Sequence, residues 1–190
     1  MSIRLHEIHP SLAHFPLVLV PLAIASDLIG RLTDNRVLMR FAKALMPVAA
    51  ASGAATAAAG LAAQEAVTRT GEANDLLVTH RNLNAGIVGV VAGLAVARAR
   101  TAYPGTGYLV TGLAVVAGMA YTAYLGGKMV YRHGVGVAAA GGVRDGKSPD
   151  LGRDGLAESA RVAAANVIEA ARHASRDLGA GRIAPALRKR

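Results

Sequence analysis

The residues best suited to chemistry in this sequence are histidines, because the chain has six of them and no cysteine. Without thiols, the sequence cannot form disulfides, Cys-ligated iron–sulfur clusters or the covalent attachment of c-type haem. Any metal or haem must therefore be held by imidazole, thioether, phenol or carboxylate groups. We expect five of the histidines on one side of a membrane, because an order of four spanning helices brings their positions in the chain to that side: His6, His9, His14, His80 and His133.

His14 and His80 are the candidate ligand pair. His14 lies about one turn beyond Pro10, or roughly 6 Å into a helix that rises about 1.5 Å per residue. His80 opens a different apolar segment. Imidazoles from two helices are the usual axial ligands of b-type haem in four-helix membrane cytochromes, so we predict that His14 and His80 bind haem b. Basic side chains expected on the same side could meet the haem propionates: Arg81, Lys128 and Arg132.

Two other interpretations of these histidines stay open. A transition-metal site made of His9, His14 and His80 is a variant of the same idea. Alternatively, the histidines are interfacial and bond to backbone or lipid headgroups, since His, Tyr, Lys and Arg gather at membrane surfaces for ordinary reasons. Ionisable groups within a membrane are costly and biased toward function, which favours His14 over His9 as a functional group.

Long apolar segments must position these histidines. Hydrophobic residues make up 53% of the chain and charged residues only 17%. A membrane-spanning helix needs about 20 mostly apolar residues, and four segments qualify: residues 11–30, 42–63, 81–97 and 107–130. We therefore expect an all-α, polytopic membrane protein with a four-helix transmembrane bundle. A cleaved signal peptide is the rival interpretation of the first segment, disfavoured by its weakly charged leader and internal prolines.

Local spacing gives three further expectations. Asp27 and Arg31 lie four residues apart, which predicts an interfacial ion pair on one helix. Small residues recur in segments 42–63 and 81–97, which predicts that these two helices form a tightly packed inner pair. We expect no buried acidic residue in the last three segments, which argues against a proton- or ion-coupled transporter.

The chain divides by composition into a transmembrane domain (1–137), a Gly-rich linker (138–155) and a basic, Ala-rich helical tail (156–190). Small and apolar positions recur at helical spacing in the tail, and Gly179 is a helix-end signal. The net charge is +9, and residues 144–190 hold ten of the 21 Lys and Arg residues. Such a tail can attract anionic lipids. We expect no nucleic-acid binding, because no reader motif is present, and no site residue in the tail.

Both ends of the apolar region resemble a bacterial membrane family catalogued only as a domain of unknown function. Residues 9–16 read H-P-S-L-A-H-F-P, similar to the family's H-P-x-x-x-H-F-P opening. Residues 124–137 read Y-L-G-G-K-M-V-Y-R-H-G-V-G-V, similar to its Y-L-G-G-x-L-V-Y-x-x-G-V-G-V ending. A histidine opening the third helix, here His80, also fits. The resemblance covers residues 6–137, and nothing carries over to the tail.

The resemblance implies a layout similar to that of membrane b-type cytochromes. Relatives joined to c-type cytochrome or Rieske domains imply an electron-transfer setting. The sequence thus favours a haem-binding electron-transfer subunit in the inner (cytoplasmic) membrane, with the lipid bilayer, a redox protein and further copies of itself as partners. The alternative is a non-catalytic membrane scaffold whose basic tail recruits a partner. With no nucleophile motif, the chain is not expected to be an enzyme by itself. Loop charges leave its orientation open.

Overall fold

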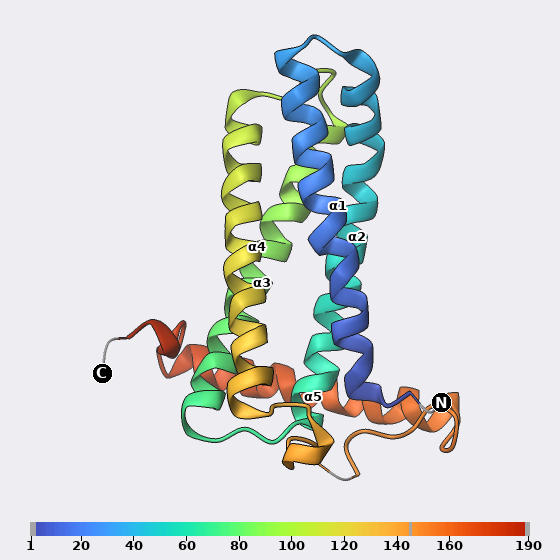
Figure 1. Ribbon diagram of the computed structural model, residues 1–190, viewed down its shortest axis with the longest axis vertical. Helices are drawn as coiled ribbons and strands as arrows, with labels where there is room; N and C mark the ends of the chain where they lie inside the picture. The colour runs from blue at the N-terminus through green and yellow to red at the C-terminus, as the bar shows by residue number, and fades with distance from the viewer. Residues whose placement is uncertain (1–2, 145, 189–190) are drawn as a thin grey trace. The chain divides into compact units, whose positions relative to one another are not determined.

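The computed structural model describes residues 3–144 and 146–188, and the regular elements of those residues are all helices. Four are long: α1 (Leu5–Leu32), α2 (Arg36–Ala66), α3 (Gly71–Ala99) and α4 (Thr106–His133) (Figure 1). Each is long and apolar enough to cross a membrane. At about 1.5 Å per residue they exceed the roughly 30 Å thickness of a bilayer core. The predicted all-α, multi-pass membrane protein is confirmed.

The helices extend past the apolar segments that the sequence predicts. The largest difference is in α3, which begins at Gly71 instead of near Arg81. Its first turns carry Glu72 and Asp75, and both carboxylates form ion pairs with basic side chains from elsewhere in the fold. A hydropathy criterion ends a segment at such charges, whereas the helix continues because the charges find partners.

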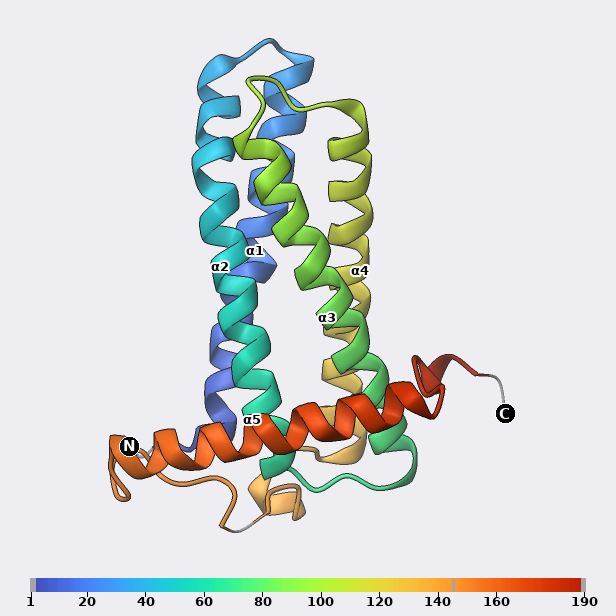
Figure 2. The ribbon, with the colours of Figure 1, turned by 180° about the vertical axis from the view of Figure 1, so that it is seen from behind.

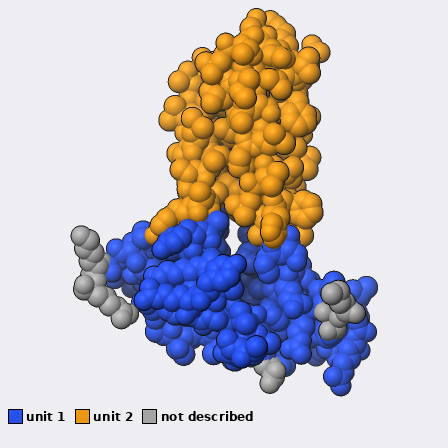
Figure 3. Space-filling view, in the orientation of Figure 1, with its two compact units in different colours: residues 1–11, 57–84, 122–190 blue, residues 12–56, 85–121 orange. Residues whose placement is uncertain are grey.

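The chain forms two compact units, each containing a section of all four long helices (Figure 3). Unit 1 comprises residues 1–11, 57–84 and 122–190; unit 2 comprises residues 12–56 and 85–121. The units cut across the domains expected from composition, because unit 1 combines the tail with the ends of the helices. Each unit has its own apolar core, around Ile24 and Met46 in unit 2 and around Leu76 and Leu125 in unit 1.

The expectation that the second and third helices form the inner pair is wrong. Only 17% of the apolar window of α2 and of α3 is buried, against 33% for α1 and α4. A methyl group added at Gly86, Gly89 or Gly93 of α3 would meet nothing within 4 Å. Because close packing of small residues requires a neighbouring backbone, this glycine ridge contributes nothing to packing among the described residues.

Asp27 does not form the expected surface pair with Arg31. It is fully buried in unit 2 and accepts two hydrogen bonds from Arg98 of α3, at 2.7 and 2.8 Å. Arg98 also donates to the carbonyl oxygens of Met39 and Thr101. Arg31 donates instead to the Pro104 carbonyl and the Thr106 hydroxyl. Spacing of i and i+4 allows a pair only where both side chains share one exposed face, and Asp27 faces inward.

The tail of unit 1 folds back onto the ends of the long helices. Helix α5 (Leu156–Gly179) lies across α2 and α3 in this unit (Figure 2). Asn166 of α5 donates to the Ala62 carbonyl at 3.1 Å. The segment between α4 and α5 contains a 3₁₀ turn, η1 (Ala138–Ala140). It also forms two isolated bridges, through Val143 with Val67 and through Asp150 with Arg4. A second 3₁₀ turn, η2 (Pro185–Leu187), follows α5.

Candidate functional site

Two histidines from different helices, His9 of α1 and His80 of α3, are in contact in unit 1. Their ring centroids lie 6.4 Å apart, with the planes at 86°. The Nδ1 atom of His80 is 2.9 Å from the carbonyl oxygen of Thr122 on α4. Since a carbonyl can only accept a hydrogen bond, His80 Nδ1 carries the proton and Nε2 keeps its lone pair. His80 therefore presents the nitrogen that a neutral imidazole uses to bind metals.

Glycines on the other two helices lie against this pair. A methyl group at Gly60 of α2 would lie 3.0 Å from Cε1 and Nδ1 of His9, closer than normal packing allows. A methyl group at Gly126 of α4 would lie 3.5 Å from Cε1 of His80, an ordinary contact. All four long helices thus contribute one residue each to the histidine pair. We call His9 and His80, together with these two glycines, the histidine pair.

A short hydrogen-bond chain runs between the His80 backbone and α4. Asn84, one turn along α3, donates to the His80 carbonyl at 2.8 Å. The Thr122 hydroxyl on α4 donates to the Asn84 side-chain oxygen at 3.1 Å. These bonds join α3 to α4 beside the imidazole. Metal-ligating histidines are commonly held by an outer hydrogen bond of the kind that His80 makes to Thr122.

The structure brings His9 to His80. His14 is exposed and belongs to unit 2, whereas His9 and His80 belong to unit 1. Two residues five apart on a helix point about 140° away from each other, so only one of His9 and His14 can face a given neighbour. The rotation of α1 about its axis decides which one, and the sequence does not specify that rotation. A ligand role for His14 stays a prediction.

The predicted propionate partners make other contacts. Arg81 donates to the Asp177 carboxylate of α5 at 2.9 Å. Lys128 donates to Glu72 at 2.8 Å. Arg132 is exposed near the end of α4. Two of the three basic groups are therefore ion-paired within the chain, and their role toward a haem stays a prediction.

Sequence reasoning missed a buried carboxylate. Glu65, in the last turn of α2, is 0% exposed and hydrogen-bonds to Arg69 at 3.0 Å and to His173 Nδ1 at 2.9 Å. The three predicted segments contain no acidic residue, but α2 runs on to Ala66 and so includes Glu65, two residues beyond segment 42–63. The cause of its burial is tertiary: α5 folds over this end of α2. One signal was available, since Asn166 and His173 lie seven residues apart and hence on one face of α5.

Glu65, Glu169 and His173 could in principle hold a metal ion, because their ligand atoms lie within 4.8 Å of one another. Cationic side chains already occupy both carboxylates. Lys147 donates to Glu169 at 2.8 Å, and this ammonium group lowers the pKa of the Glu169 carboxyl. Arg69 donates to Glu65. The group therefore acts as an ion-paired cluster that attaches the tail to the helices.

Comparison with known proteins identifies the family of this chain. Residues 5–139 match the model of a family of predicted membrane proteins, DUF2231, and the chain belongs to that family. No curated protein and no solved structure matches the chain. All residues of the histidine pair lie within the matched range, whereas α5 lies beyond it.

Proposed function

We propose that this DUF2231 membrane protein is an electron-transfer subunit that binds b-type haem through the histidine pair. The observation that carries the proposal is the hydrogen bond from His80 Nδ1 to the Thr122 carbonyl, which leaves Nε2 of His80 available beside His9. Bound haem would supply one-electron redox chemistry. The contribution of the chain would be to hold and orient the imidazoles in a membrane-embedded helix bundle.

The available donors suit this cofactor. The sequence has no cysteine, so thiolate ligation and covalent attachment do not compete. A metal held between two imidazoles separates the ring centres by roughly 5–6 Å, given metal–nitrogen distances of about 2 Å. The 6.4 Å between His9 and His80 is near that range. His14, the ligand that the sequence suggests, is the alternative second imidazole.

The test is a reduced-minus-oxidised visible spectrum of the full-length protein, purified in detergent after expression with added haem precursor. We expect a bis-histidine b-type signature that is lost in His80→Ala. Loss in His9→Ala with retention in His14→Ala would assign His9 as the second ligand, and the reverse pattern would assign His14. His133→Ala is the control, because His133 is the last residue of α4 and is not part of the histidine pair. This substitution should leave the spectrum unchanged.

A flat spectrum would reject the haem proposal. A single transition-metal ion on His9 and His80 is then the second candidate, favoured by the same ring spacing. Elemental analysis would detect it, with a stoichiometry that falls in His80→Ala. A protein without colour or metal would leave the non-catalytic membrane scaffold whose basic tail recruits a partner, and would discard the electron-transfer role.

A further inference from the structure

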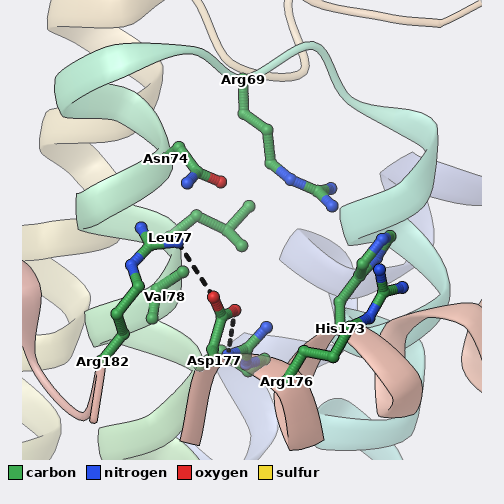
Figure 4. A pocket seen from close by; sticks show the side chains of 9 residues that line it. Arg69, Asn74, Leu77, Val78, His173, Arg176, Asp177 and Arg182 are labelled. Carbon is green, nitrogen blue, oxygen red and sulfur yellow. Dashed lines mark hydrogen bonds and ion pairs between the residues drawn. The ribbon is translucent and has the colours of Figure 1, made fainter. Parts of the chain in front are cut away.

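Unit 1 contains a small pocket where α5 crosses α3, distinct from the histidine pair. Its volume is about 270 Å³. Figure 4 shows side chains from the α2–α3 turn, from α3 and from α5 and the segment after it lining one hollow. The ionisable groups that line it are Arg69, Arg81, Arg176, Arg182, His173 and Asp177. We call this the arginine pocket.

The charges in the arginine pocket are unbalanced. Four guanidinium groups line it, and Asp177 is the one carboxylate among its described lining residues. Asp177 is shared between Arg81, at 2.9 Å, and Arg182, at 3.0 Å. Arg182 also pairs with Asp75, and Arg69 pairs with Glu65, which leaves Arg176 without a carboxylate partner among the described residues. Each guanidinium group carries five N–H donors, more than these contacts use. The pocket therefore presents unsatisfied donors and excess positive charge.

Two of the arginines are held in place before any ligand arrives. The Arg69 side chain is 15% exposed and donates to the Gln64 carbonyl and to Glu65. The Arg81 side chain is 10% exposed and donates to Asp177 and to the Asn82 side chain. Guanidinium groups fixed in this way lose little conformational freedom when they bind an anion, so the site is preorganised.

Arg176 is the group best placed to respond to a ligand. Among the described residues, its side chain makes one hydrogen bond, a long one of 3.4 Å from Nε to the Arg172 carbonyl. Its two terminal nitrogens have no protein partner in the described part of the chain. An exposed arginine beside a pocket of fixed arginines can close on a bound anion and add two parallel hydrogen bonds.

We propose that the arginine pocket binds a phosphate group, supplied by an anionic lipid headgroup or by a free phosphate. Arginine forks match the oxygens of phosphate, and several converging guanidinium groups favour its double negative charge. Pockets for drug-sized ligands are about 300–1,000 Å³, so a cavity at the lower limit suits a compact group. The pocket adjoins the turn between two spans, where lipid headgroups lie.

The nearby carboxylates do not make this a cation site. Glu65 and Asp75, which are not among the lining residues, already bind Arg69 and Arg182. Asp177, the carboxylate among the described lining residues, is likewise paired with Arg81 and Arg182. The proposal is also independent of the haem proposal, because no residue of the histidine pair lines the pocket.

The experiment uses the full-length protein in detergent and in nanodiscs. Native mass spectrometry in detergent would count bound lipids after addition of phosphatidic acid, phosphatidylglycerol or phosphatidylcholine, and isothermal titration would measure inorganic phosphate. We expect selective binding of phosphatidic acid or of inorganic phosphate. Arg176→Ala should weaken it about tenfold, as for loss of charge-assisted hydrogen bonds. Arg176→Lys, which keeps the charge but loses the fork, should recover only part of the affinity.

Arg161→Ala is the matched control, because it removes the same charge from the same helix at a site that pairs with Glu158 and lies outside the pocket. Thermal unfolding would verify that Arg176→Ala remains folded. Binding of phosphatidic acid but not of inorganic phosphate would assign a lipid headgroup as the source of the phosphate group. Binding of inorganic phosphate alone would assign a soluble ligand. Failure of both, or equal losses in Arg161→Ala and Arg176→Ala, would overturn the proposal.

Discussion

The histidine pair and the arginine pocket lie in the same unit but are built on opposite principles. The pair consists of imidazole rings seated against glycines, with one contribution from each long helix. The pocket consists of charges, and four of its six ionisable lining groups come from the tail: His173, Arg176, Asp177 and Arg182. The pair falls within the family match at residues 5–139 and the pocket only partly so. The difference separates a candidate site formed by the helix bundle alone from one that the tail completes.

The largest expected effect is a loss of stability caused by a substitution in unit 2, which contains neither site. Asp27→Asn leaves Arg98 as an unpaired buried charge in unit 2, and breaking such a pair costs about 3–5 kcal/mol. Thermal or denaturant unfolding in detergent would measure the loss. Asp27→Leu with Arg98→Met, which removes both charges, should recover most of it. Equal stability of the double variant and Asp27→Asn would show that the ion pair contributes little.

The next effect should separate the two sites. Gly60→Ala places a methyl group 3.0 Å from His9, so His9 or α2 must move, at about 1–3 kcal/mol. Gly126→Ala is the control, because its methyl group would make an ordinary contact with His80. We expect Gly60→Ala to change the haem spectrum and to leave phosphate binding intact. A change in phosphate binding without a change in the spectrum would contradict the separation.

A third substitution should affect the arginine pocket and leave the histidine pair unchanged. His173→Ala removes a hydrogen bond to the fully buried Glu65, with an expected cost of about 1–3 kcal/mol for a poorly satisfied buried acid. The loss should appear as faster proteolysis within α5 and weaker phosphate binding, with the haem spectrum unchanged. His6→Ala offers a comparison at a histidine that contacts Ser148 and not α5.

The smallest effect is a dependence on pH. Lys147 lowers the pKa of Glu169 from its ordinary value of 4.5. The resulting stabilisation is present above pH 4.5 and is lost as the pH falls through the lowered pKa of the folded state. Both side chains are more than a third exposed, so we expect only a few tenths of a kcal/mol. Glu169→Gln should remove this increment from the acid limb of an unfolding curve, and an unchanged limb would contradict it.

Histidine positions illustrate how far the sequence predicts the site. The alternation of spans predicted that the start of α1, the start of α3 and the end of α4 would meet, and His9, His80 and His133 do share unit 1. The sequence could not show that His9 contacts His80, because that contact depends on how α1 is rotated; a ligand role for His14 stays a prediction. Hydropathy carries no information about that rotation when both faces of a helix are apolar.

The partners of buried charged residues are a second feature that the sequence did not predict. Asp27 was assigned to Arg31 because sequence spacing reveals only neighbours on one helix, whereas its partner Arg98 is 71 residues away. Glu65 was assigned to a loop because a charge ends an apolar segment. In the fold, Arg69 and His173 satisfy Glu65, and α2 continues past it.

The sequence alone determined that this chain is a four-span helical membrane protein with a basic helical tail, because span length and apolar composition follow from the thickness of the bilayer. Tertiary structure alone decided which imidazole meets His80, which acids are buried and where the arginines converge. These features depend on helix rotation and on the docking of α5, both set by contacts between residues far apart in the chain. The histidine pair was therefore partly foreseeable, and the arginine pocket was not.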